Sequence, residues 1–196
     1  MSRTLALLVC LAAASAFGCE PGADNQGPTT QPADASGEER TAVANIVPSK
    51  AASTQPGQGQ PKGTITFHQT DDEVHISGEI SGLQPNSRHG IHIHETGDLS
   101  APDLSSAGGH FNPDNHPHGA PATQGAVHAG DLGNLEANDQ GVAKMDLTVE
   151  NITLGAGENN VVGKPVIIHA KADDLKSQPS GDAGARIGGG IIELQE

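Results

Sequence analysis

The chain has 196 residues, enough for one domain with appendages, and a formal net charge of −14 at pH 7. The sequence contains no basic patch, which argues against nucleic acid or an anionic membrane face as a partner. It has 26 glycines, 13 prolines, 3 phenylalanines and no tryptophan or tyrosine. Any core must therefore be built from Val, Ile, Leu and Ala, and this turn-rich composition favours short strands over long helices.

Residues 1–19 resemble an export signal. Arg3 supplies a positive charge, and the apolar stretch TLALLVCLAAASAF that follows is too short to span a bilayer comfortably. Two endings stay open: cleavage after the small residues 14–16, or a lipoprotein signal ending at Cys19, which the polar segment after that cysteine favours. In both cases we expect the mature domain outside the cytoplasm, in the periplasm or cell envelope, and in the second a lipid on Cys19 would anchor it to the membrane.

Residues 20–40 are predicted to form a disordered tether, because they contain almost no large apolar side chains and cannot bury enough surface to offset the entropy of ordering. The two cysteines of the chain, Cys10 and Cys19, both lie in the signal. The predicted domain, residues 41–196, therefore has no disulfide, and its stability must come from packing, hydrogen bonds or bound metal.

From Thr41 onward, short apolar runs alternate with turn residues, a pattern typical of an antiparallel barrel or sandwich. The expected strand segments are residues 42–47, 63–69, 73–80, 90–95, 141–149, 165–170 and 188–194. Two connections, from Thr96 to about Leu135 or beyond and from Lys171 to about Arg186, are too long for simple turns. We expect both to be functional loops.

The segment GIHIHETGD, residues 90–98, contains two histidines at alternate positions of a strand. Because successive side chains of a strand point to opposite faces, Ile91 and Ile93 share one face, and His92 and His94 share the other. Two interpretations are open at this point: a pair of metal ligands, or an exposed strand face with two polar rings.

Metal-ligand spacing also occurs in the first long loop. The pattern is H-x7-H-x9-H-x2-D, formed by His110, His118, His128 and Asp131. Three imidazoles and one carboxylate make a closed tetrahedral set typical of structural zinc, although a histidine-rich loop without this role is the alternative. His92, His94 and His169 form a second, all-imidazole group, which suits copper as well as zinc.

The segments GIHIHETGD, SAGGHFNP, HAGDLGN, VIIHAKADDL and GDAGARIGGGII occur in the order, and nearly at the spacings, of the copper–zinc superoxide dismutases. The resemblance runs from about Ala42 to the C-terminus. It implies an all-β fold, an eight-stranded antiparallel Greek-key barrel with two long functional loops. It also implies an enzyme that disproportionates superoxide to dioxygen and hydrogen peroxide at a copper redox centre beside a zinc ion.

The resemblance assigns roles to individual residues. It implies that copper is bound by His92, His94, His110 and His169, and that zinc is bound by His110, His118, His128 and Asp131. His110 would be the bridging imidazolate, which takes a proton and delivers it to the peroxide being formed. Asp173 would link one histidine of each metal site and so fix both rings, and Arg186 would guide the substrate anion.

The chain also departs from the family pattern. The usual disulfide is absent, because Leu104 and Gly189 occupy the matching positions, and the loop of residues 173–186 is some six residues shorter than the common eukaryotic form. The domain contains 19 acidic and 8 basic residues from Thr41 onward, which predicts long-range repulsion of an anion. The oligomeric state stays open between a monomer and a homodimer.

The other four histidines receive no metal role. His68 and His75 are expected at the surface, His116 has no counterpart in the family, and His89 matches a structural histidine of the family. The alternative function is a noncatalytic, exported copper- and zinc-binding module on the same scaffold. Such a store would not require Arg186 or Asp173, so these residues favour the enzyme.

Overall fold

The computed structural model describes residues 39–54, 57, 59–121 and 126–196. The predicted signal and residues 20–38 of the predicted tether lie outside the described residues. The chain divides into a unit ending at Ala35 and a second unit, Ser36–Glu196, to which all the described residues belong. In that described part, no helix combines the length and the apolar character needed to cross a bilayer.

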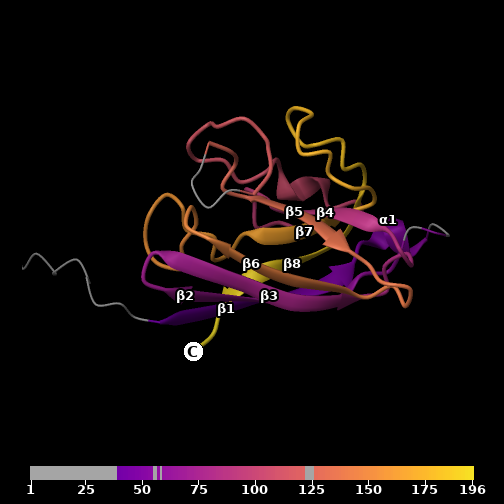
Figure 1. Ribbon diagram of the computed structural model, residues 1–196, viewed down its shortest axis with the longest axis horizontal. Helices are drawn as coiled ribbons and strands as arrows, with labels where there is room; N and C mark the ends of the chain where they lie inside the picture. Colours follow the sequence, from indigo (N-terminus) through magenta and orange to yellow (C-terminus); the bar gives the residue numbers. More distant parts are fainter. Residues whose placement is uncertain (1–38, 55–56, 58, 122–125) are drawn as a thin grey trace, which may run out of the picture. The chain divides into compact units, whose positions relative to one another are not determined.

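The described part of the second unit contains eight antiparallel strands. They are β1 (Arg40–Pro48), β2 (Lys62–Thr70), β3 (Glu73–Ser81), β4 (Arg88–Ile93), β5 (Asp131–Glu136), β6 (Ala143–Val149), β7 (Pro165–His169) and β8 (Arg186–Leu194). Their order in the sheet is β5-β4-β7-β8-β1-β2-β3-β6, and β5 also contacts β6, so the sheet curls into a nearly closed barrel (Figure 1). The predicted all-β Greek-key barrel is confirmed.

Alternation along the strands builds the core. Ile65 and Phe67 of β2 and Ile76 of β3 are fully buried inside the barrel. Their outward-facing neighbours Thr66 and His75 are at least partly exposed. Strand β4 differs, because five of its six residues are buried. Ile91 and Ile93 pack into the core as predicted. His92 and His94 point to the other side, where loops cover them.

Two elements were not predicted from the sequence. Strand β5 lies inside the expected connection from Thr96 to about Leu135, where its sequence DLGNLE has little intrinsic strand preference. Pairing with β4 stabilises it and sets Asp131 opposite His92 in the ladder. The second element is a short helix, α1 (Lys50–Ser53), whose first turn is capped by the Ser49 hydroxyl accepting the Ala52 N–H at 3.0 Å.

Arg40, which ended the predicted tether, is the first residue of β1. The two long loops leave the same side of the barrel, one after β4 and one after β7 (Figure 1). The first contains a 3-10 turn, η1 (Ser105–Ala107). Both loops are long and largely irregular, so the side chains that hold them against the barrel decide the geometry of the candidate site.

Candidate metal centre

Strand ends and loops bring the predicted ligands together. His92 belongs to β4, His94 follows its last residue, and His169 is the last residue of β7. Strand β4 pairs with β7 along Ile91↔Ile168 to Ile93↔Val166, so these histidines project from adjacent strands. Asp131 is the first residue of β5, and the first long loop supplies the other ligands. The barrel therefore fixes four ligands directly.

The first ligand group consists of four buried histidines whose ring nitrogens lie within 4.8 Å of one another: His92, His94, His110 and His169. The Nε2 atoms of His94 and His169 are 3.4 Å apart, and the rings of His92 and His110 stack with their centroids 3.9 Å apart. An all-imidazole set of this kind suits copper or zinc.

Two ring nitrogens in this group, His92 Nδ1 and His110 Nε2, are buried and have no hydrogen-bond partner in the structure. An unsatisfied buried polar atom costs about 1–3 kcal/mol, so native proteins rarely leave one without a reason. A bound cation would satisfy both nitrogens. The donor chemistry of the first group therefore fits a copper ion.

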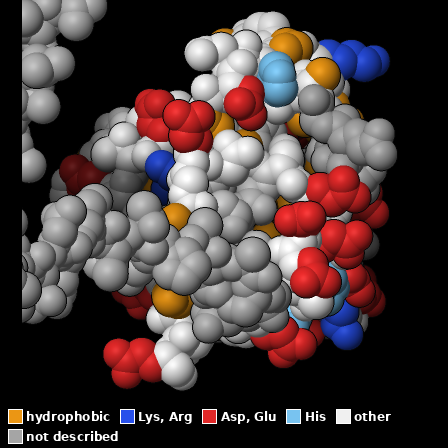
Figure 2. Space-filling view, turned by 90° about the vertical axis from the view of Figure 1, so that its left-hand side faces the viewer, with side chains coloured by type: hydrophobic (Ala, Val, Ile, Leu, Met, Phe, Trp, Pro, Cys, Tyr) orange, Lys and Arg blue, Asp and Glu red, His pale blue; other side chains and the backbone are white. Residues whose placement is uncertain are grey.

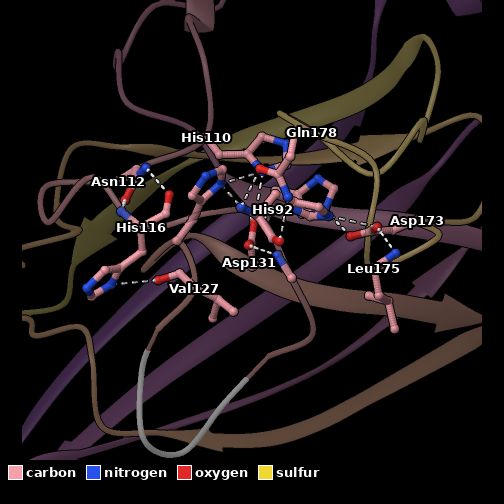
Figure 3. Close-up of polar contacts among 12 residues, drawn as sticks. His92, His110, Asn112, His116, Val127, Asp131, Asp173, Leu175 and Gln178 are labelled. Carbon is pink, nitrogen blue, oxygen red and sulfur yellow. Dashed lines mark hydrogen bonds and ion pairs between the residues drawn. The ribbon is translucent and has the colours of Figure 1, made fainter.

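The second ligand group is formed by His110, His118, His128 and Asp131, all of them buried. Asp131 Oδ1 lies 2.8 Å from His110 Nδ1, 2.9 Å from His118 Nδ1 and 3.3 Å from His128 Nδ1 (Figure 3). Three imidazole nitrogens thus converge on one carboxylate oxygen, which is the donor set of a closed zinc site. His110 contributes Nδ1 here, which leaves its unpartnered Nε2 to the first group.

Asp173 connects the two groups. Its Oδ2 lies 2.8 Å from His92 Nε2 and its Oδ1 lies 2.9 Å from His118 Nε2, and all three side chains are fully buried. The carboxylate is itself held in place, because the side-chain amide of Asn134 donates to the Asp173 carbonyl at 3.0 Å and accepts its N–H at 2.7 Å. A carboxylate that contacts the outer nitrogens of two ligands fixes their tautomers and ring orientation.

Burial favours the neutral imidazole at three residues of the first group, His92, His94 and His169. It lowers the pKa of His92 and His94 far below the usual value for histidine, and it lowers that of His169 to about 4. In the second group, burial alone would lower the pKa of His118, but the carboxylates of Asp173 and Asp131 raise it. Neutral imidazole is the form that binds a metal ion, so these three histidines can accept one at neutral pH.

Arg186, the first residue of β8, pairs with His169 across the β7–β8 ladder. Its guanidinium donates to the carbonyl oxygens of Leu104 and Gly108, both at 2.6 Å. A pocket of about 290 Å³ opens beside it. Burial lowers the pKa of Arg186 from its usual value of 12.5, which leaves the side chain charged in neutral solution.

The two positions that match the family disulfide are neighbours here as well. The Leu104 side chain packs with Ala107 and Ile167, and its Cδ1 would lie 3.4 Å from a Cβ placed at Gly189. Helix α1 adds a second attachment for the same loop, because the Ala51 N–H donates to the Pro102 carbonyl at 2.9 Å. Apolar packing and main-chain hydrogen bonds thus hold the loop that positions Arg186.

The other histidines lie outside the metal groups found among the described residues. His68 contacts Thr41 Oγ1 at 3.1 Å and His75 contacts Asp146 at 2.9 Å on the outer barrel surface. His116 lies 3.3 Å from the Val127 carbonyl. His89 is buried, with its Nδ1 2.8 Å from the carbonyl oxygen of the candidate ligand His169.

Sequence reasoning missed two residues at the site, Asn134 and Gln178. Each pairs its side-chain amide with both main-chain groups of one site residue, Asn134 with Asp173 and Gln178 with His118. Neither residue type marks a metal centre, and these contacts exist only once the loops have folded. The sequence therefore carried no signal for them.

Comparison with known proteins agrees with this geometry. The family model for copper/zinc superoxide dismutase matches residues 61–192. The Cu-Zn superoxide dismutase of Paramecium bursaria Chlorella virus 1 is 42% identical over 141 residues, which cover 69% of this chain and 74% of that protein. A solved structure described as a crystal structure analysis of the clock protein EA4 matches with a TM-score of 0.66 at 36% identity, covering 79% of this chain and 94% of the other. The chain belongs to the copper/zinc superoxide dismutase family, whose members are enzymes that use copper and zinc.

Proposed function

We propose that this superoxide dismutase uses the first ligand group for copper and the second for zinc. The observation that carries the proposal is the position of His110, which belongs to both groups through different ring nitrogens. Its Nδ1 contacts Asp131, and its buried Nε2 has no protein partner. A single imidazole between two ions would couple the two sites chemically.

The net reaction converts two superoxide anions and two protons into dioxygen and hydrogen peroxide. Copper bound in the first group would supply the one-electron redox chemistry, and zinc would supply a fixed positive charge on the other side of His110. The protein must then attract the anion, keep the ligand rings oriented and deliver protons.

Arg186 is suited to attracting the anion. Its guanidinium stays charged at neutral pH, and two carbonyl oxygens on the first loop hold it beside the ligand strand. This local attraction matters because the domain is strongly acidic overall, with 19 acidic and 8 basic residues from Thr41 onward. Figure 2 shows red acidic side chains spread over one face, with few blue basic ones. Short-range attraction at Arg186 therefore opposes long-range repulsion.

His110 Nε2 is the atom suited to holding a proton, because no group of the described residues hydrogen-bonds to it and its ring is fixed through Nδ1. Asp173 keeps His92 and His118 in one orientation while His110 changes its protonation. We assign His110 to proton delivery and Arg186 to anion guidance. The rival function, a noncatalytic metal-binding module, has no support in the comparisons.

Metal analysis together with an assay of superoxide loss tests the proposal. We expect one copper and one zinc per chain, with activity that requires copper. Full occupancy of both sites without superoxide loss would refute the catalytic role and favour the metal-binding module.

We also propose that the protein is exported to the periplasm or cell envelope. The support is compositional: residues 1–19 have the charge and apolar length of a signal, and Cys19 precedes a polar segment. Mass spectrometry of the mature N-terminus separates the two endings, since a diacylglycerol on Cys19 indicates the lipoprotein, and an unmodified N-terminus after residue 16 indicates ordinary cleavage. An N-terminus that retains Met1 would refute export.

A further inference from the structure

Gln178 lies in the second long loop and contacts the first. Its Oε1 accepts the His118 main-chain N–H at 2.8 Å, and its Nε2 donates to the His118 carbonyl at 2.9 Å. Sixty positions separate the two residues in the sequence. One side-chain amide therefore satisfies both main-chain groups of a single residue, in the way a neighbouring strand would.

These two hydrogen bonds have no substitute among the described residues, because the His118 main chain makes no other there. His118 is buried, with 4% of its surface exposed. It also lies in an irregular segment that no strand pairing supports. A main-chain N–H of a buried residue left without an acceptor is costly. The hydrogen bonds from Gln178 therefore stabilise the position of His118 more than those of a surface glutamine usually stabilise their surroundings.

The same short segment holds the His118 ring. Asp173 Oδ1 contacts His118 Nε2 at 2.9 Å, and Gln178 follows five residues later (Figure 3). The segment between them is closed by local hydrogen bonds: Asp174 Oδ1 accepts the N–H of Ser177 at 2.8 Å, and the Asp174 N–H donates to the Gly181 carbonyl at 2.9 Å. His118 is thus fixed at its ring and at its main chain by one compact turn.

We infer that Gln178 is a positioning residue for the zinc ligand His118, tying the loop that carries this ligand to the turn that carries Asp173. The inference rests on the proposed assignment of zinc to the second ligand group. Gln178 does not contact the ligand nitrogens. It acts through the main chain, so its loss should let His118 move away and release zinc sooner.

The test compares Gln178→Met, which keeps the length and loses the amide, with Gln178→Glu, which keeps an acceptor and loses the donor. Gln195→Met is the matched control, because the Gln195 amide makes only a 3.4 Å contact at an exposed strand end. Two quantities are measured on the full-length protein loaded with copper and zinc: hydrogen exchange of the His118 amide, and the rate of zinc transfer to a coloured chelator.

For Gln178→Met we expect faster exchange at His118 and a zinc release rate raised about 5- to 30-fold, because the variant loses both partly buried hydrogen bonds to the His118 main chain. Gln178→Glu should fall between this variant and the parent, and Gln195→Met should match the parent in both measurements. Unchanged exchange refutes the contact, and faster exchange with unchanged zinc release refutes the positioning role. If the parent takes up no zinc, the proposed function fails, while exchange at His118 still tests the contact itself.

Discussion

Gly181 lies in the second loop, against the Asp173 carboxylate that links the two ligand groups. Its φ is +65°, and a Cβ added there would overlap Asp173 Oδ1 and lie 2.7 Å from His118 Nε2. Substitution by alanine therefore requires the buried carboxylate to move. Asp173 Oδ1 would then lose its contacts with His118 and with the Leu175 N–H.

The expected cost has two parts. An alanine at positive φ costs about 1–2 kcal/mol. Two lost hydrogen bonds to a buried carboxylate add about 1.5 kcal/mol each, or about 3 kcal/mol together. Gly163→Ala is the matched control, because Gly163 has a φ of +83° and open space around the position of a Cβ. Gly163→Ala should lose only the free energy that an alanine at positive φ costs.

Urea unfolding of the metal-free proteins gives the two free energies. We expect Gly181→Ala to be less stable than Gly163→Ala by about 3 kcal/mol, which corresponds to a melting temperature about 6–12 °C lower for a domain of this size. After loading, Gly181→Ala should also retain less zinc than the control. Equal stability and equal zinc retention in the two variants would refute the proposed link between Gly181, Asp173 and the ligands.

Four further predictions follow from the site. His169→Ala should abolish copper binding and activity while most of the zinc remains, and metal analysis showing loss of both metals would contradict separate sites. Asp131→Ala should remove zinc, keep copper and lower the melting temperature relative to the loaded parent, and equal melting temperatures of the zinc-bound and metal-free parent would contradict a structural zinc. Arg186→Glu should lower the second-order rate more than tenfold at constant metal content, and added salt should speed this variant because ions screen the new repulsion; the same salt slope in parent and variant would argue against guidance. Dithiothreitol should leave the melting temperature unchanged once chelation is controlled, since the two cysteines, Cys10 and Cys19, both precede the barrel.

The fold was largely predictable from alternation. Ile91 and Ile93 point inward and His92 and His94 outward because a strand has a two-residue period, and the sequence shows that period directly. Strand β5 was not predictable in the same way, because the glycine and asparagine in DLGNLE disfavour a strand. Its formation depends on pairing with β4, a contact distant in the sequence.

The candidate ligands were also predicted as a set, because the spacings suggested two groups of ligand-type residues and the resemblance to the family assigned the individual residues. The residues that hold the ligands in place were not predictable. Asn134 and Gln178 act through side-chain amides on the main chain of residues 39 and 60 positions away. Nothing local in the sequence distinguishes such amides from ordinary surface ones, because the partners meet only in the folded loops.

The pairing of His169 with Arg186 also bears on how this protein can vary. The two residues occupy the same rung of the β7–β8 ladder, so main-chain hydrogen bonds of the barrel set their separation, and the loop between them, residues 170–185, does not. Most insertions or deletions in that loop would leave both ends in place. The loop between β7 and β8 can therefore vary in length during evolution, provided that the turn from Asp173 to Gly181 is kept. Under the same condition, it is a suitable place to insert foreign segments by design.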